Sequence, residues 1–190
     1  MNIAYTKLSL SQLSAETEAL AREAQTLCGP LNELRLNWRP SAAQWSVAQC
    51  LEHLLKANGE MFSACDKAVG ATQRQTIWQC LPVWPHVFGW LLITSQSPNS
   101  KQKFKANQPA QPASNAIDVQ IVSRFLAQQH ELIERMQALE DAAAARVVMI
   151  SPFVRFITYS LLDGYRLIVA HERRHIEQAR RVTQAPGFPA

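Results

Sequence analysis

The sequence has few cysteines, and they follow no regular spacing. Four of them are spread along 190 residues without forming a C-x-x-C pair: Cys28, Cys50, Cys65 and Cys80. This pattern argues against a disulfide framework or a cysteine-based metal motif. The N-terminus also lacks the charged and apolar regions of a secretory signal. We therefore expect reduced thiols and a cytoplasmic protein.

Long hydrophobic runs are absent as well. The most apolar stretch, residues 77–93, is short for a membrane span and contains Gln79, Pro82, Pro85 and His86, so we reject a span. The net charge is only +4, and its basic residues do not cluster with stacking aromatics, so nucleic acid is not an expected partner. We find no internal repeat, no useful strand alternation and no glycine-rich phosphate loop.

What the sequence does contain is helical periodicity over most of its length. Apolar residues make up 47% and charged residues 18%, which is typical of a globular chain, and we expect one domain over residues 1–190. Apolar spacings of three and four predict helices over residues 10–27, 47–70, 118–139 and 151–182. Gly29-Pro30 ends the first helix, and Ser46 with Gln49 predicts a capping box for the second. Ser151-Pro152 predicts the start of the fourth.

Residues 71–116, between the second and third helices, show no clear periodicity. Their first part carries four aromatic residues, Trp78, Trp84, Phe88 and Trp90, and residues 95–116 are rich in Pro, Gln, Asn and Ser. We expect the aromatic side chains to be largely buried, against the bundle or a partner chain, and residues 95–116 to be exposed or mobile. Such a long connection is usually a functional loop or lid, and the alternative is a surface crossover.

Together these elements predict an all-α fold. The arrangement we expect is a four-helix bundle in up-down-down-up order, with a long crossover between the second and third helices. Short links make the first two helices antiparallel, and likewise the last two. The long link allows the second and third helices to run parallel. The second helix is then antiparallel to the fourth.

Two histidines near the C-terminus point to a metal site. His171 and His175 are four residues apart in a helix, so they share one face and are close enough to hold one ion. They continue an apolar stripe that includes Leu161 and Ile168. His53 lies about 10 Å from the start of the second helix, and the pair lies about 10–18 Å from the end of the fourth. Because these helices are antiparallel, His53 can meet the pair at one level.

Two motifs resemble those of a known family. Residues 45–54, WSVAQCLEHL, resemble the W-S-x-x-E/Q-x-L-x-H-L signature of the DinB-like superfamily, and residues 171–178, HERRHIEQ, resemble its H-x-x-R-H-x-x-Q signature. The resemblance covers essentially the whole chain, because Trp38-Arg39-Pro40 and Ser151-Pro152 are similar too. It implies an up-down-down-up bundle with a divalent metal on His53, His171 and His175. The long segment 71–116 departs from the compact family pattern.

The resemblance also implies a function. Members with known activity are metal-dependent enzymes that use low-molecular-weight thiols, as S-transferases or as an isomerase. We therefore expect thiol-dependent S-transferase-like chemistry on a small-molecule substrate, with nickel, zinc, iron or manganese bound, in a homodimer. Arg174 matches the second motif and is a candidate for binding an anionic thiol. The alternative is a non-catalytic metal-binding or stress-associated dimeric interaction protein.

A metallopeptidase is a third alternative. His171-Glu172-x-x-His175 also satisfies the H-E-x-x-H signature, with Glu172 as the general base. A third ligand would have to follow downstream. Only residues 176–190 remain there, and their one carboxylate, Glu177, points elsewhere on the helix.

Several neighbouring residues have competing interpretations. Cys50, one turn before His53, is either a fourth ligand or a buried core thiol. Three polar residues are candidates for orienting the imidazoles: Glu52, Glu172 and Gln178. For the two glutamates, the alternative is a solvated helix position. His86 and His130 have no partner at metal spacing and are treated as ordinary histidines.

Overall fold

The fold is taken from a computed structural model that describes residues 4–70, 83–96, 110–113, 116–154 and 156–190. The chain is mostly helical, which confirms the predicted all-α class. In order along the chain, the elements are η1 (Tyr5–Lys7), α1 (Leu10–Cys28), α2 (Glu33–Asn37), α3 (Val47–Val69), α4 (Val83–Gln96), α5 (Ile121–Gln137), α6 (Asp141–Arg146), β1 (Val148–Ile150), β2 (Thr158–Ser160) and α7 (Leu161–Thr183).

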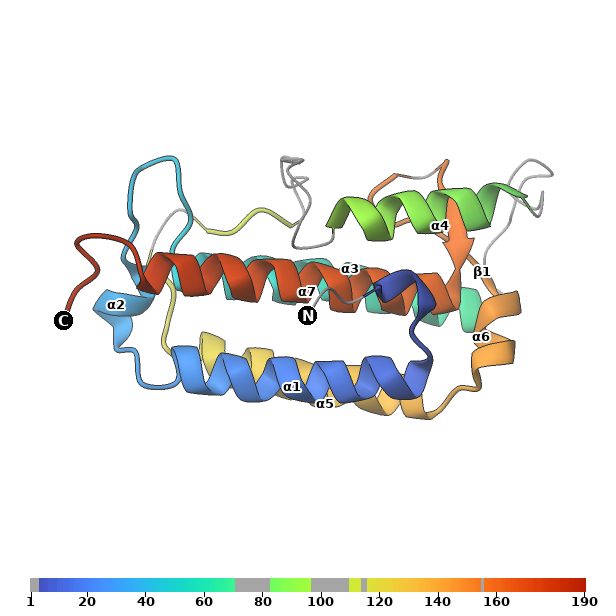
Figure 1. The fold of residues 1–190 in the computed structure, drawn as a ribbon, viewed down its shortest axis with the longest axis horizontal. Coiled ribbons are helices and arrows are strands. Elements are labelled where there is room, and N and C mark those ends of the chain that lie inside the picture. Colours follow the sequence, from blue (N-terminus) through green and yellow to red (C-terminus); the bar gives the residue numbers. More distant parts are fainter. Residues whose placement is uncertain (1–3, 71–82, 97–109, 114–115, 155) are drawn as a thin grey trace.

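The hydrophobic core lies between the four longest helices. Helix α1 packs against α5 and α7, and α3 packs against the same two helices (Figure 1). Each helix contributes side chains that are completely buried, among them Leu20, Leu51, Phe125 and Val169. Burying one such side chain stabilises the fold by about 1.5–3 kcal/mol. None of the helices in the described ranges is long and apolar enough to cross a membrane.

Local caps fix where the first long helices begin. Ser46 accepts a hydrogen bond from the backbone N–H of Gln49, whose side chain accepts one from the N–H of Ser46. This is the capping box that the sequence predicts, and Ser9 with Gln12 forms another at the start of α1. Helix α1 ends at Cys28, immediately before Gly29-Pro30. The histidine-bearing helix α3 is therefore fixed at its N-terminus by local chemistry.

The predicted start of the last helix is wrong. Helix α7 begins at Leu161, and Ser160, rather than Ser151, provides its cap by accepting from the N–H of Asp163. The residues before it form an antiparallel hairpin in which Met149 pairs with Tyr159. Both of these side chains are buried. Burial of the hairpin in the core therefore outweighs the helical spacing in this stretch.

The crossover contains a helix that the sequence analysis missed. Helix α4 packs against α7, β2 and η1, and Figure 1 shows it above the first half of α7. Ile93 is buried on its inner side, whereas Trp90 is 57% exposed. Trp90 is therefore not buried against the bundle of its own chain, and Phe88 is only partly buried. Trp78 and the side chain of Trp84 lie outside the described residues.

The second part of the crossover also differs from expectation at one point. Ala110 is only 3% exposed, although residues 95–116 were expected to be exposed or mobile. Its burial follows from the contacts of its backbone with α3, which are part of the site described next.

Candidate metal centre

The structure brings together the three histidines that the sequence indicates. His53 comes from α3, and His171 and His175 come from α7, which packs against α3. One ring nitrogen of each lies within 4.8 Å of the others, and the Nε2 atoms of His53 and His171 are 3.2 Å apart. Two nitrogen ligands at about 2.0–2.1 Å from one ion are separated by about 3–3.5 Å. The spacing therefore fits a shared cation.

The ring of His53 is held by the chain itself. Its Nδ1 lies 2.6 Å from the backbone carbonyl oxygen of Ala110, which can only accept a hydrogen bond. Nδ1 therefore carries the proton, and Nε2 presents a lone pair to the other two histidines. This is the arrangement in which a histidine binds a metal through one nitrogen while the other nitrogen is fixed by an outer partner.

Burial keeps the three imidazoles neutral. It lowers the pKa of His53, and together with the neighbouring His53 and Arg174 it lowers the pKa of His171 to about 3. The pKa of His175 is also well below its ordinary value, first because of burial and then because of the other two histidines and Arg174. Neutral imidazole is the form that binds a metal. The cluster is thus in its ligand form at neutral pH.

Of the three residues expected to orient the imidazoles, Gln178 interacts with His175. Its side chain raises the pKa of His175 through a hydrogen bond, which is the smallest of the influences on that pKa. The Nδ1 atom of His175 is buried and has no hydrogen bond of good geometry within the described residues. A buried nitrogen of this kind can be met by an ion or a water. The donor set of three neutral imidazoles suits a divalent transition metal.

An aromatic ring and an arginine border the histidines. Trp45 stacks on His175, with ring centroids 5.7 Å apart and planes at 22°, and its ring centroid is 4.9 Å from that of His53. Arg174 donates from Nη1 to the carbonyl oxygen of Ser95, in the last turn of α4. Cys50 is fully buried and part of the hydrophobic core, so the core-thiol interpretation holds.

Glu172 does not orient an imidazole. Its side chain is fully buried, and its Oε1 accepts hydrogen bonds from Asn58 at 2.7 Å and from Gln129 at 2.8 Å. Burial raises its pKa to about 7. This carboxyl group lies between α3, α5 and α7 rather than at the open side of the histidines. It cannot act there as a general base, which argues against the H-E-x-x-H peptidase.

Glu52 binds backbone and a lysine rather than an imidazole directly. Its Oε2 accepts from the backbone N–H of Ala113 at 2.6 Å, and its Oε1 is 3.3 Å from the ammonium group of Lys56. The site contact that sequence reasoning missed is the carbonyl of Ala110, a backbone group that leaves no side-chain signal. His130 is exposed on α5, as expected for an ordinary histidine, and the side chain of His86 lies outside the description.

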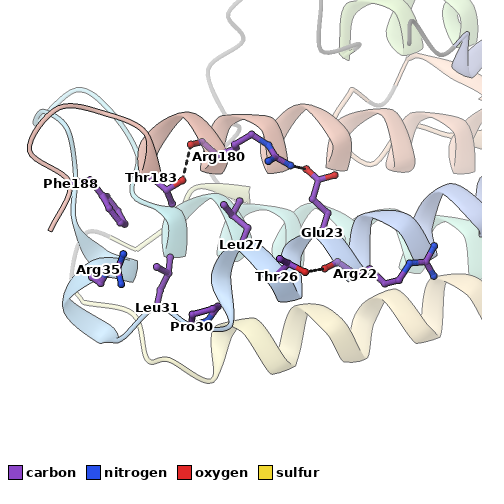
Figure 2. A pocket seen from close by; sticks show the side chains of 10 residues that line it. All are labelled: Arg22, Glu23, Thr26, Leu27, Pro30, Leu31, Arg35, Arg180, Thr183 and Phe188. Carbon is purple, nitrogen blue, oxygen red and sulfur yellow. Dashed lines mark hydrogen bonds and ion pairs between the residues drawn. The ribbon is translucent and has the colours of Figure 1, made fainter. Parts of the chain in front are cut away.

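A cavity of about 560 Å³ lies elsewhere, between the ends of α1 and α7 and the C-terminal tail. Figure 2 shows its lining, in which Arg180 is paired with Glu23 at 2.5 Å. The side chains of Arg22 and Arg35 extend from opposite ends of the view and do not converge on one point. None of the three histidines lines this cavity, so we do not assign it to the site.

Comparison with known proteins agrees with the two motifs. A family model described as the DinB superfamily matches residues 16–179, which include both motifs and all three histidines. Comparison of the chain with curated proteins and with solved structures gives no significant match. Since the family model covers most of the chain and the predicted histidine cluster is present, the chain belongs to the DinB superfamily.

Proposed function

We propose that this protein binds one divalent metal ion through His53, His171 and His175 and uses it to transfer a small thiol to an electrophilic substrate. The observation that carries the proposal is the convergence of three neutral imidazole nitrogens within 4.8 Å. Among the described residues, no cysteine or carboxylate joins this group. Three histidines leave coordination positions open, which is typical of a catalytic rather than a structural site.

The bound ion would supply Lewis acidity that lowers the pKa of a small thiol and holds its sulfur as a nucleophile. The chain provides the surroundings of that sulfur. Trp45 covers one side of the histidines, and Arg174, which influences the pKa of both His171 and His175, adds positive charge for an anionic thiol. In the reaction a sulfur–carbon bond forms, the thiol proton is released, and the electrophile loses its leaving group with the bonding electrons.

Nickel, zinc and iron suit imidazole ligands, whereas manganese favours oxygen ligands, and experiment would decide among the four metals expected from the sequence. The protein would be reconstituted with each ion and screened against pairs of thiols and electrophiles, with loss of free thiol as the readout. Turnover that depends on the metal supports the proposal. His171→Ala should abolish both metal retention and turnover, while circular dichroism shows that the helices remain. His130→Ala removes an exposed histidine and should change neither.

The alternative is a non-catalytic metal-binding or stress-associated interaction protein. A metal-loaded protein that turns over no pair in the screen would favour it over the transferase. We further propose a small-molecule substrate, a homodimer and a cytoplasmic location. Among the described residues, Cys28, Cys50 and Cys65 are free and buried, which supports a reducing compartment.

We also propose one domain over residues 1–190 with the helix order up-down-down-up. The ion pairs between α1 and α7 follow the same order along both helices. Arg173 pairs with Glu16, and Arg180, later in α7, pairs with Glu23, later in α1, as in a parallel pair. Contacts between α3 and α7 run in opposite senses. His53 meets His171, whereas Met61, later in α3, meets Tyr159, just before α7. These contacts support the proposed order.

A further inference from the structure

We propose that the short segment Ala110–Ala113 is part of the metal centre: by docking on α3 it sets the orientation of His53, so metal binding and docking of the segment strengthen each other. This inference rests on the proposed metal binding. It assigns a positioning role to Gln49, Glu52 and Lys56, whose side chains bind the backbone of the segment.

Four polar contacts join this segment to one face of α3. Besides the hydrogen bond from His53 to the Ala110 carbonyl, Lys56 donates to the carbonyl of Gln111 at 3.0 Å. At Ala113 both backbone groups are used: its N–H donates to Glu52 at 2.6 Å, and its carbonyl accepts from Gln49 at 2.9 Å. The segment is the yellow-green coil in Figure 1, and its contacts place it beside α3.

A second anchor holds the chain shortly after the segment. The side-chain amide of Asn37, the last residue of α2, donates to the carbonyl of Ile117 and accepts from its N–H, both at 2.8 Å. Ile117 itself is buried. The chain is thus held to the bundle on α3 at Ala110–Ala113 and on α2 at Ile117.

The effect on His53 follows from its burial. Only 6% of this residue is exposed, so its Nδ1–H has little access to water. If the Ala110 carbonyl moves away, the ring can exchange its proton between the two nitrogens or rotate, and Nε2 no longer presents a fixed lone pair. Removing such outer partners of a metal-binding histidine typically costs about 10–100-fold in metal affinity. By linkage, a bound metal must favour docking of the segment by the same factor.

Glu52→Ala tests the coupling without touching a ligand. It removes the acceptor of the Ala113 N–H, whereas Glu52→Gln retains an oxygen that can accept. Glu60→Ala is the matched control, because Glu60 is an exposed carboxylate on the same helix. The affinity for Zn²⁺ would be measured by competition with a chromophoric chelator. We expect it to fall about 10–100-fold in Glu52→Ala, to recover in Glu52→Gln and to stay unchanged in Glu60→Ala.

A second measurement works without any metal. Nitrogen chemical shifts of the imidazoles report which nitrogen of His53 carries the proton. They should show Nδ1–H in the wild type and a mixture of the two forms in Glu52→Ala. Equal tautomers and equal Zn²⁺ affinities in these two proteins would overturn the inference. If the wild type binds no Zn²⁺ while the tautomer still changes, the proposed function fails and the positioning of His53 by the segment stands.

Discussion

Two buried polar clusters lie on adjacent faces of a single turn of α7, and they differ in the groups that they bring together. In one, Oε1 of Glu172 accepts hydrogen bonds from the side-chain amides of Asn58 and Gln129, and Oε2 has no partner within the described residues. In the other, the Nε2 atoms of His53 and His171 lie 3.2 Å apart, and His175 adds a third imidazole. A carboxyl group held by two amides of neighbouring helices suits a structural role. Three converging imidazoles suit a metal ion.

A third face of the same turn carries the charged side chain of Arg173. Arg173 pairs with Glu16 at 2.8 Å and with Glu23 at 2.6 Å, both on α1, and its side chain is 17% exposed. Neighbouring residues of one motif thus take part in the proposed metal site, in core packing and in the joining of two helices. If the three faces have these separate roles, substitutions on the histidine face should change metal affinity. Substitutions on the other two faces should change the free energy of unfolding.

The largest effect is expected at the histidine face. His175→Ala should lower metal affinity by more than about 100-fold, because loss of a ligand should cost more than loss of its outer partner. The free energy of unfolding of the metal-free protein should change by no more than about 1–2 kcal/mol, since alanine favours the helix and an unpaired nitrogen is removed. Chelator competition and urea unfolding measure the two quantities. Wild-type metal affinity in this variant would remove His175 from the site.

Glu172→Ala should show the opposite pattern. It leaves two buried amide groups without their acceptor, so the free energy of unfolding should fall by about 1–3 kcal/mol. Metal affinity should remain within about threefold of the wild type, a difference below 1 kcal/mol. Glu172→Gln retains an acceptor oxygen and is the matched control, with most of the stability kept. A large loss of metal affinity at unchanged stability would place Glu172 in the metal centre.

The charged face should have a smaller effect on stability, because its ion pairs are partly exposed. Arg173→Ala should lower the free energy of unfolding by about 1–2 kcal/mol, with no change in metal affinity. Arg173→Lys keeps the charge but loses the planar fork that reaches both glutamates, so an intermediate loss is expected. Urea unfolding in low and high salt would check this. A loss that does not shrink in high salt would contradict the ionic account.

The smallest effect is expected from a stabilising change on α3. Gly59 lies in the exposed part of this helix, and an added Cβ would meet no atom within 4 Å. Gly59→Ala should therefore raise the free energy of unfolding by about 0.5–1 kcal/mol. Metal affinity should stay unchanged. A parallel rise in both quantities, measured by urea unfolding and chelator competition, would show that stability and metal binding are not separate.

The sequence predicted the elements that depend on local signals. The capping box of Ser46 and Gln49 involves residues three apart, so it can be read directly. Ser151-Pro152 and Ser160-Leu161 are both reasonable helix starts, and pairing of β1 with β2 decides between them. That pairing is not local. Helix α4 is apolar on most sides, so it has no periodic pattern to detect.

The site was predictable where helix geometry determines it. His53 and the pair His171 and His175 lie at similar distances from the same end of two antiparallel helices. That was enough to predict that the three side chains come together. The 100° step between neighbouring helical residues could also have shown that Glu172 points away from His171. The Ala110 carbonyl could not have been found in this way, because backbone acceptors look alike in every sequence.

X-ray absorption spectroscopy of the metal-loaded protein tests the central claim most directly. One equivalent of Zn²⁺ would be bound, and the scattering around it would be fitted for the type and number of ligands. We predict three imidazole nitrogens at about 2.0–2.1 Å, with the remaining coordination from light atoms such as water. A sulfur shell at about 2.3 Å, or fewer than three imidazoles around the ion, would contradict the assignment of His53, His171 and His175 as the metal ligands.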